Sequence, residues 1–584
     1  MKNIKILILT LVLFVTSLPL TANEDIMQAM RDEIKRSMAE LELESLQKPY
    51  YIEYKLTISD DYSIGSRHGV IENSDRNRSA YLDVFVRVGD YKFDNSNYFD
   101  FGLSLFGSSD DEEKFKSRKI AYELDYDALR RELWLATDAA YKRSAEIYSK
   151  KVATIKNRVR KDTTHDFLRS EANKTNNYKE TPRFDVERFE SLMKNVSSVF
   201  LKYDQFDVSY AGVEFHPKTI YYVNSEGMEY INTEYYSGLE IIAALQADDG
   251  MPLATMYFTQ SKDPNQLPTL DSLKKAAEKV AQKLTKLIEA PTLEEPYSGP
   301  VLFEGEAAAE IFAQVFASSL ATQRPPLTES GIQDLESNST FQNKIGGRVL
   351  PEFLSIDAIP NSKEYKGIGL SGYFELDDQG IKPEDVNLVK NGYLKALLSN
   401  RTPTRRVRES NGHQRGGAAM ISNLHLTSKE DHRKPNDSLR ARMLKLCKDR
   451  ELEYGIVVRQ AFNSNVMYTT LMRNFGNKWP ISFGNPKIYL IEVYKLYHDG
   501  RQELIRGAEA AGFTVQSFKD ILNVGDSEYV LNYYAPAITS PFISGGDMYV
   551  QSSVIVPDIL FEDGDIKSMT EDFTKPPLIS KPGK

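Results

Sequence analysis

The feature that most constrains this 584-residue chain is a segment rich in proline and acid near its middle. Residues 289–300 read Glu-Ala-Pro-Thr-Leu-Glu-Glu-Pro-Tyr-Ser-Gly-Pro, and proline supports neither a helix interior nor a central strand. The chain is also too long for a single ordinary hydrophobic core. We therefore predict two domains, at residues 23–290 and 300–570, that meet at this segment.

The composition and the patterning favour an α+β fold. The 33 tyrosines and 28 phenylalanines favour β-rich structure over a helical array. The first half alternates strands with amphipathic helices, whereas the second half reads as short strands separated by glycine, asparagine and aspartate turns. We predict an N-terminal α/β domain with an antiparallel sheet and helices, and a C-terminal β-rich domain that resembles a barrel or a sandwich.

Residues 110–181 are predicted to form a helical insertion in the N-terminal domain. Apolar residues keep to one face of a helix over residues 127–160. Residues 161–181 are polar and show no period, and we interpret them as a mobile linker.

The first 22 residues have the pattern of a secretory signal peptide. Lys2 and Lys5 supply positive charge, residues 6–18 are apolar apart from threonine and serine, and Ala22 offers a small residue for cleavage. The apolar run is too short to span a bilayer, and no later segment approaches the roughly 20 apolar residues that a span needs. We therefore predict export to the periplasm or the extracellular space, and no transmembrane segment.

The net charge and the cysteine count argue against several classes of function. A formal net charge of −10 does not favour a nucleic-acid backbone as the partner. Cys447 is the single cysteine, so no intramolecular disulfide can form and a zinc site has no cysteine cluster available. Because Cys447 lies in the pattern of an amphipathic helix, we predict that it is a small core residue.

The segment at residues 300–312 carries the main candidates for chemistry. A short apolar strand runs into a helix on which Glu306 and Glu310 lie one turn apart on one face. At this spacing a zinc peptidase holds two histidines around a glutamate that activates water. Here Gly305 and Glu310 stand at the ligand positions, and two carboxylates favour a hard cation over zinc. Acidic residues also stabilise the first turn of a helix, so a purely structural role stays open.

The other chemistries have weaker signals. The seven histidines are dispersed with no pair at ligand spacing, and His413 and His425 share a region rich in glycine and polar residues. No Gly-x-Ser-x-Gly elbow, phosphate loop or dinucleotide fingerprint occurs. Residues 415–417, Arg-Gly-Gly, are able to approach a ligand backbone or to form an ordinary turn.

A series of short motifs follows the chain in a fixed order. They are Arg87–Tyr91, Asp94–Ser96, Val223–Gly227, Asp248–Gly250, Pro300–Phe303 before an Ala-rich helix at Ala307, Asp377–Ile381, Lys390–Leu394, Ser410–Gly416, Ser422–Leu424, Arg506–Glu509 and Val556–Phe561. In this order they resemble the TldD/PmbA (TldD/TldE) family, whose members are often described as modulators of DNA gyrase. The resemblance covers nearly all of the chain after the signal, apart from residues 110–181.

The resemblance implies both a fold and an assembly. The family joins an N-terminal α/β domain to a C-terminal β-rich domain, and its known assemblies pair a zinc peptidase with a similar non-catalytic subunit. The catalytic type has His-Glu-x-x-x-His on this helix and a later cysteine. Here Gly305 and Glu310 occupy the histidine positions, and no cysteine follows Cys447. The resemblance therefore implies the non-catalytic TldE/PmbA-type branch, with zinc expected only in an intact family member or partner, and no other cofactor.

Two hypotheses from different classes follow. The first is an exported pseudoenzyme that acts as a peptide-binding or scaffold partner of a homologous zinc peptidase, or as a homodimer, and holds an extended peptide by edge-strand pairing. The second is an active peptidase or metallopeptidase that uses Glu306, with Glu310 and His413, at a non-standard site. A purely structural envelope protein fits the composition but leaves the ordered motifs unexplained. An exported, acidic chain does not favour a role in gyrase modulation.

Overall fold

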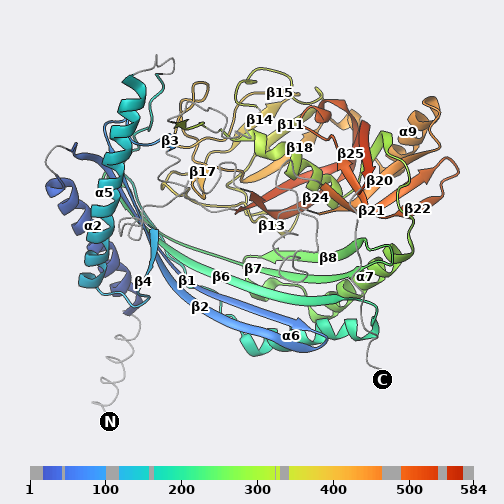
Figure 1. Ribbon diagram of the computed structural model, residues 1–584, viewed down its shortest axis with the longest axis horizontal. Helices are drawn as coiled ribbons and strands as arrows, with labels where there is room; N and C mark the ends of the chain where they lie inside the picture. The colour runs from blue at the N-terminus through green and yellow to red at the C-terminus, as the bar shows by residue number, and fades with distance from the viewer. Residues whose placement is uncertain are drawn as a thin grey trace, which may run out of the picture.

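The structure is a computed structural model that describes residues 18–42, 46–99, 117–156, 163–322, 324–328, 341–462, 488–536 and 549–569. The predicted signal peptide lies almost wholly outside the described residues, as does the start of the predicted insertion. None of the described helices is both long and apolar enough to cross a bilayer. The α+β prediction is confirmed, with an antiparallel sheet and helices in the N-terminal half and a β-rich C-terminal half that contains a closed barrel (Figure 1).

The N-terminal sheet is antiparallel apart from one short strand. Its strands are β1 (Pro49–Arg67), β2 (Val70–Val88), β4 (Ser117–Ile120), β5 (Lys174–Asn177), β6 (Val208–Asn224), β7 (Glu229–Gln246) and β8 (Pro252–Ser261). In the described part of the chain their order is β4-β2-β1-β6-β7-β5, and β8 pairs with the second half of β7. The exception is β5, which runs parallel to β7.

Side chains alternate along these strands, so the sheet has one apolar face and one polar face. On β1, Ile52, Tyr54 and Leu56 are fully buried in a cluster with the helices. Lys55, which points to the opposite face, lies 3.7 Å from Asp378 of the C-terminal half. The polar face of the sheet is therefore turned toward the second domain.

Helices cover the apolar face of the sheet. They are α2 (Leu18–Glu40), α5 (Tyr126–Lys156), α6 (Val186–Ser197) and α7 (Leu270–Glu289). α2 and α5 pack on one end of the long strands, and α6 and α7 pack on the other end (Figure 1). The helix predicted within the insertion is α5, whose Leu129, Leu133 and Ala136 are fully buried. This helix is therefore part of the domain core and does not project from it.

Residues 163–181 are not the mobile linker that the sequence predicted. Asp166 and Phe167 are buried, and β5 adds a strand to the sheet. The Asp166 carboxylate lies 2.8 Å from Lys151 Nζ and 3.0 Å from Arg324. The polar composition misled the prediction because these polar groups are bound by buried partners, which removes the cost of taking them out of water.

The C-terminal domain is built on a five-stranded barrel. Its strands are β9 (Tyr297–Phe303), β20 (Tyr454–Ala461), β21 (Ile488–Tyr497), β23 (Ala508–Ala511) and β25 (Tyr549–Ser568). Each pairs with the next in the order β9-β20-β21-β23-β25, and β25 pairs back onto β9, which closes the ring. The proline- and acid-rich segment lies between the end of α7 and the start of β9.

Further strands extend the sheet beyond the barrel on the side of β25. On this side they are β18 (Asn423–Ser428), β11 (Leu354–Ala358), β14 (Val386–Lys390) and β15 (Tyr393–Leu394), together with β24 (Ile521–Pro536), which pairs with β25. β22 (Gln502–Ile505) pairs instead with β21. The short pairs are β3 (Tyr98–Phe99) with β10 (Leu327–Thr328), β12 (Glu364–Tyr365) with β13 (Ile368–Gly369), β16 (Gln414–Arg415) with β17 (Ala418–Ala419), and β19 (Arg433–Lys434) with β24. α9 (Asn436–Asp449) packs on the outside of β9 and β20.

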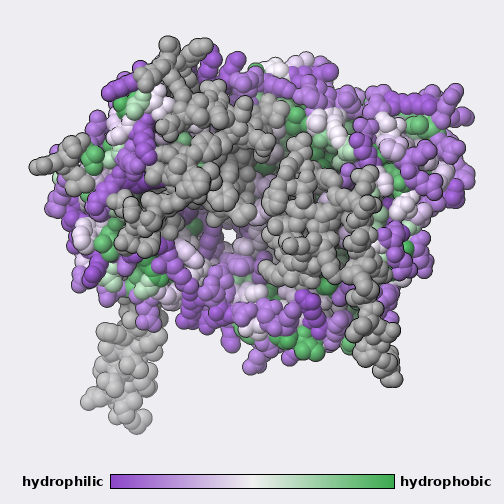
Figure 2. Space-filling view, in the orientation of Figure 1, coloured by the Kyte–Doolittle hydropathy of each residue, from purple (hydrophilic) through white to green (hydrophobic). Residues whose placement is uncertain are grey.

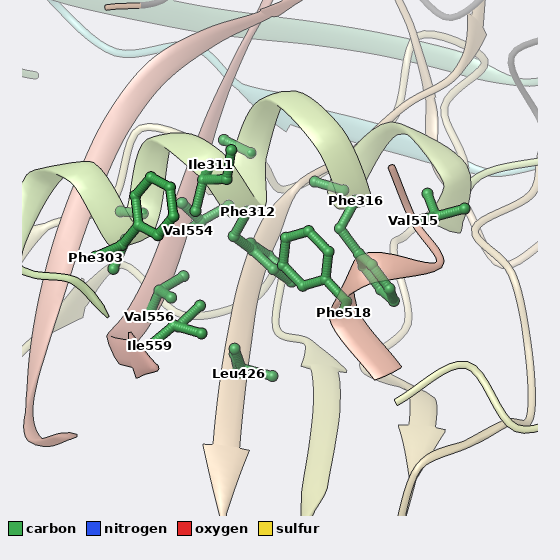
Figure 3. Close-up of a cluster of buried hydrophobic side chains, with 14 of the residues drawn as sticks. Phe303, Ile311, Phe312, Phe316, Leu426, Val515, Phe518, Val554, Val556 and Ile559 are labelled. Carbon is green, nitrogen blue, oxygen red and sulfur yellow. The ribbon is translucent and has the colours of Figure 1, made fainter. Parts of the chain in front are cut away.

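α8 (Glu306–Ile311) and the turns after it run through the core of this domain. Residues 307–309 are alanines with no exposed surface, and small side chains let a helix lie close to the strands around it. The rings of Phe312 and Phe316 follow, with centroids 5.6 Å apart, and both contact Phe518 (Figure 3). The apolar packing therefore fixes the position of α8, including the face that carries the two glutamates.

The buried guanidinium of Arg401 joins the two domains. It donates to the backbone carbonyl of Leu168 at 2.6 and 2.9 Å and to the carboxylate of Glu226 at 2.6 Å. It also lies 4.0 Å from the centroid of the Phe167 ring. Arg401 is 1% exposed. A buried ion pair of this kind fixes the geometry of the groups that it joins, because breaking it leaves a charge without a partner.

We expect Arg401→Met to lower the free energy of unfolding by about 3–5 kcal/mol, because Glu226 would lose its cationic partner and the Leu168 carbonyl would lose its donor inside the protein. Urea denaturation followed by circular dichroism measures the change. The matched control is Arg450→Met, because Arg450 also pairs with two carboxylates, Glu562 and Asp563, but near the surface. There we expect a loss of about 1 kcal/mol or less. Equal losses in the two variants would contradict the role of Arg401 as a buried ion pair that joins the two domains.

Candidate functional site

Ion pairs and a backbone hydrogen bond hold the junction between β9 and α8. The Glu304 carboxylate accepts hydrogen bonds from Arg440 at 2.8 and 2.9 Å and from Arg459 at 3.0 Å. Gly305 has a φ of +53°, and its backbone N–H donates to Asp558 at 2.5 Å. A positive φ favours glycine over residues with a side chain. The backbone at this ligand position is therefore shaped for glycine, and a histidine here would be strained.

Glu306 and Glu310 interact across one turn of α8, as their spacing predicts. Gln460 Nε2 lies 3.3 Å from the Glu306 carboxylate, and Gln314 Nε2 donates to Glu310 at 2.9 Å. Burial raises the pKa of Glu306. Burial raises the pKa of Glu310 to about 8, and the negative charge of Glu306 adds to this while Gln314 opposes it. At neutral pH, Glu310 is largely protonated, and the pair carries closer to one negative charge than two.

Two tyrosines of β24 lie near these carboxyl groups. Burial, together with the charges of Glu306 and Glu310, raises the pKa of Tyr529. The pKa of Tyr533 is raised by burial and by Glu310. The buried hydroxyl of Tyr533 has no hydrogen-bond partner among the described residues. This corner therefore combines a protonated carboxyl with an unpaired hydroxyl, a combination that suits hydrogen bonding to a ligand or transfer of a proton.

The groups present here do not fit the zinc ion that the family resemblance associates with this helix. Zinc sites take imidazole, thiolate and ionised carboxylate ligands, usually four in a tetrahedral arrangement. Gly305 offers no ligand atom, and the Glu310 carboxyl is buried, largely protonated and bonded to Gln314. Within the described ranges no group of three or more His, Cys, Asp or Glu residues is placed to hold a metal ion. We derive no chemical step through a metal at this helix.

His413 does not join the two glutamates in one site. Its Nδ1 lies 2.9 Å from the Asn411 carbonyl oxygen, and its Nε2 lies 3.4 Å from the Ser422 hydroxyl. Burial lowers the pKa of His413 to about 4, so the ring is neutral at pH 7. The described contacts of His413 include neither Glu306 nor Glu310. The histidine is a buried structural residue of the loop that contains it.

Cys447 and His425, which the sequence also singled out, have contacts that suit structural roles. Cys447 is fully buried among apolar residues of α9 and the barrel, as predicted. Burial raises the pKa of its thiol. His425 lies on β18 with its Nε2 3.3 Å from the carboxylate of Glu528.

A cleft of about 1130 Å³ lies between the polar face of the N-terminal sheet and the C-terminal domain. One wall carries alternate residues of β1 and β6 and residues 232–236 of β7, and it continues over parts of β2, residues 95–98 and α5. The other wall carries residues between 363 and 379, residues 414–417, and the ends of β24 and β25 that meet there. Figure 2 shows an opening at this level, with hydrophilic surface below it on the side of the sheet. The cleft is therefore polar on the sheet side and is formed by both domains.

Two of the sequence motifs build a wall of this cleft together. Asp377 is buried, and its carboxylate accepts backbone N–H groups from Gln379 and Ile381 at 2.9 Å and from Gln414 at 3.1 Å. Burial raises the pKa of Asp377 to about 7, against the effect of these hydrogen bonds. The motif at residues 377–381 therefore holds the motif at residues 410–416 in place, and Arg415 is presented to the cleft.

Ion pairs cross the cleft or lie on its walls. They join Lys55 to Asp378 at 3.7 Å, Lys179 to Glu375 at 2.9 Å, and Lys218 to Glu234 at 3.1 Å. Lys262 and Lys363 line the same cleft. Burial lowers the pKa of Lys262 to about 8, and the positive charges of Arg415 and Lys179 act in the same direction while the carboxylate of Glu234 opposes them.

β8 is an edge strand between the cleft and the α8 corner, by which we mean Gly305, Glu306 and Glu310 with the tyrosines of β24 beside them. It pairs with β7 on one side, and on its other side no described strand pairs with it. The Met256 carbonyl accepts a hydrogen bond from Gln460 Nε2 at 3.4 Å, and Gln460 also contacts Glu306. The open edge of β8 therefore faces the corner that holds the two glutamates.

The same edge continues toward the cleft. Because backbone groups along a strand alternate in direction, Phe258 and Gln260 direct theirs to the same side as Met256. No described residue bonds the outward backbone groups of Phe258 or Gln260. Lys262 follows the strand directly and lines the cleft. An open strand edge thus leads from α8 into the cleft.

Residues 415–417, which the sequence marked as able to approach a ligand backbone, line the cleft, whereas the cleft residues on the sheet were not identified from the sequence. One usable signal was present on β1, where Glu53, Lys55, Thr57 and Ser59 alternate with residues of the apolar face. Lys262 offered no signal of its own, because its importance comes from the residues that the second domain places beside it.

Comparison with known proteins gives a consistent result. A sequence profile of the family described as the PmbA/TldA metallopeptidase C-terminal domain matches residues 295–568. No curated protein is similar enough in sequence to count as a relative.

Solved structures share the fold over most of the chain. A protein described as a modulator of DNA gyrase from Thermotoga maritima MSB8 is 14% identical with a TM-score of 0.54, over 88% of this chain and 96% of that one. TldE from Thermococcus kodakarensis is 13% identical with a TM-score of 0.54, over 92% and 99%. A protein described as a modulator of DNA gyrase from Bacteroides thetaiotaomicron is 11% identical with a TM-score of 0.54, over 92% and 98%. At these identities the likeness shows the fold alone.

Glu310→Gln tests the buried carboxyl through the pH dependence of stability. The pKa of Glu310 is about 8 in the folded protein and 4.5 for an ordinary glutamate. Between these values the unfolded chain has lost the proton and the folded chain has kept it, so the glutamate lowers stability increasingly as the pH rises from 4.5 to 8. The free energy of unfolding of Glu310→Gln, relative to that of the unchanged protein, should therefore increase over this window by on the order of 4 kcal/mol. Above pH 8 the difference should level off.

Urea denaturation at pH 5, 6.5 and 8.5 measures this difference. The matched control is Glu430→Gln at an exposed glutamate, which should show no such trend. A pH-independent difference between Glu310→Gln and the unchanged protein would contradict the burial of this carboxyl.

Proposed function

The chain belongs to the TldD/PmbA/TldE family, and from this premise we propose that it is an exported pseudoenzyme, a peptide-binding or scaffold subunit that partners a homologous zinc peptidase. The observation that carries the proposal is the α8 corner. There Gly305 holds a positive φ and Glu310 is a buried carboxyl bonded to Gln314. These groups do not supply the two imidazoles that a helical zinc site needs.

The open edge of β8 supports binding of an extended peptide. A peptide strand that pairs with Phe258 and Gln260 satisfies backbone groups that lack partners among the described residues. The polar cleft beside the strand then receives alternate side chains of that peptide. Backbone pairing supplies affinity with little dependence on sequence, and the cleft supplies selectivity.

The partner and the compartment are parts of the same proposal. The pattern of residues 1–22 supports export. The partner is a homologous subunit that carries the intact zinc motif, and a homodimer is the alternative assembly. The first observation to make is whether a neighbouring gene encodes such a homologue.

An enzyme acting alone is the second candidate function. It is favoured by Glu306, a partly exposed carboxyl whose raised pKa suits a general acid or base. This candidate requires the purified protein to hydrolyse peptides by itself and to lose that activity in Glu306→Gln. We expect no hydrolysis by the protein alone, with zinc or with a chelator, measured on a fluorogenic peptide library. Activity that appears only after a zinc-bearing homologue is added would support the subunit role.

Edge-strand pairing predicts a binding pattern that side-chain contacts alone do not produce. The probe is an uncharged heptapeptide of alternating valine and threonine with capped ends, labelled with fluorescein. Successive peptide N–H groups alternate between facing β8 and facing away. N-methylation at every second position should weaken binding about tenfold per site in one register, because each methyl group removes a backbone hydrogen bond. N-methylation in the other register should have little effect.

Fluorescence anisotropy with the mature chain measures these affinities. The two N-methylated peptides serve as controls for each other, because they have the same composition and differ only in register. Equal affinity of both methylated peptides and the parent would contradict strand pairing, and absence of binding by all three would contradict the peptide-binding function.

A further inference from the structure

Two lysines of the cleft, Lys262 and Lys363, flank the ring of Tyr373. Lys262 Nζ lies 4.3 Å from the ring centroid and donates to the Tyr373 carbonyl oxygen at 3.3 Å. Lys363 Nζ lies 5.2 Å from the centroid of the same ring. Lys262 follows β8 of the N-terminal sheet, whereas Lys363 and Tyr373 belong to the C-terminal domain. The pair of ammonium groups is therefore assembled by the meeting of the two domains.

These two lysines differ from their neighbours in having no ion-pair partner among the described residues. Lys55, Lys179 and Lys218 each lie within 3.7 Å of a carboxylate. For Lys262 and Lys363, no carboxylate of the described residues lies within ion-pair distance. Two positive charges thus share one aromatic ring without a counter-ion from the described chain. A bound anion would stabilise the charged forms of both lysines.

The charges that face Lys262 agree with this conclusion. Burial is the main cause that lowers its pKa to about 8, and Arg415 and Lys179 lower it further. Glu234 and Glu375 act in the opposite direction but do not cancel these effects. An anion placed at Lys262 would raise its pKa again, so binding of an anion and protonation of this lysine support each other.

A nearby amide group also lacks an acceptor among the described residues. The Oε1 atom of Gln260 accepts a hydrogen bond from the Ser371 hydroxyl at 2.9 Å. The Nε2 atom of Gln260 is buried and has no partner among the described residues. A buried donor without an acceptor is costly. A carboxylate has two oxygens with about four acceptor positions to offer such donors.

We propose that this part of the cleft binds a carboxylate of the extended peptide, with Lys262 and Lys363 as its cationic partners. The inference rests on the proposed function, because it names the kind of peptide that the cleft selects. Lys262 lies two residues beyond Gln260 on the open edge, so strand pairing brings one peptide position to the two ammonium groups. The carboxylate is either the peptide C-terminus, in a strand parallel to β8, or the side chain of aspartate or glutamate.

Four variants of one labelled peptide test this inference on the mature chain. They are the capped neutral peptide, the same peptide with a free C-terminal carboxylate, and amidated peptides with one internal glutamate or glutamine. We expect at least one carboxylate peptide to bind about tenfold tighter than its neutral counterpart, as hydrogen bonds to a charged group allow. The C-terminal and the glutamate peptides distinguish the two sources of the carboxylate. The gain should shrink as the pH rises above about 8, where Lys262 loses its proton.

Substitutions locate the carboxylate. Lys262→Met and Lys363→Met should each remove most of the gain, which is measured for each variant as the ratio of its affinities for the carboxylate peptide and the neutral peptide. Lys495→Met is the matched control, because Lys495 also lies over a tyrosine ring, 5.0 Å from the centroid of Tyr454, but on the barrel. It should leave the gain intact. Thermal unfolding shows whether each variant is folded. If Lys262→Met does not fold, Lys363→Met is the test, because Lys363 is exposed.

The outcomes separate this inference from the proposed function. If the neutral peptide binds and neither carboxylate improves its affinity, the inference is wrong and the peptide-binding function stands. If the gain survives in Lys363→Met and in the folded Lys262→Met variant, the carboxylate is held elsewhere and the inference is wrong. If no peptide binds, the inference and the proposed function both fail. A gain that is lost in both lysine variants and kept in Lys495→Met supports the assignment.

Discussion

The Arg401 guanidinium holds the two domains in one arrangement, and the cleft depends on that arrangement. It is buried in the contact with its acceptors on the N-terminal domain, the Leu168 carbonyl and the Glu226 carboxylate. A charge that is buried with its partners allows little displacement, because separation leaves both groups without solvent or counter-charge. The distance between the sheet and the second domain is thereby fixed, and a cleft of about 1130 Å³ stays between them.

The chemistry of the cleft follows from the alternation of side chains in the sheet. Helices cover the apolar face, so the polar face is left to meet the C-terminal domain. Lys55, Lys179 and Lys218 of the cleft are paired with carboxylates, whereas Lys262 and Lys363 meet at one tyrosine ring with no described carboxylate within ion-pair distance. The functional groups of this protein are therefore properties of the domain contact and not of a single motif.

Much of the fold was predictable because its signals are local. The strand-to-helix junction, the helical position of Glu306 and Glu310, and the buried Cys447 all follow from patterns within a few residues of sequence. The ordered motifs pointed to the right family, and several proved to be structural contacts, such as Asp377 with the loop at residues 410–416.

The errors and omissions concern contacts between distant parts of the chain. Residues 163–181 looked like a linker because their polar groups have partners far away in sequence, including Lys151 and Arg324. The described contacts of His413 include neither Glu306 nor Glu310, and spacing along the chain does not say which loops the sheet brings together. Lys262 was missed for the same reason.

The most direct test of the account is amide hydrogen exchange of the purified protein with and without a bound extended peptide. The account predicts that peptide slows exchange in residues 252–262, the open edge of β8 and the lysine that follows it, because peptide pairing protects the outward N–H groups. Exchange in α9, on the far side of the barrel, should not change. Protection at the start of α8 that requires added zinc, with no change in β8, would contradict the account and favour a metallopeptidase acting alone.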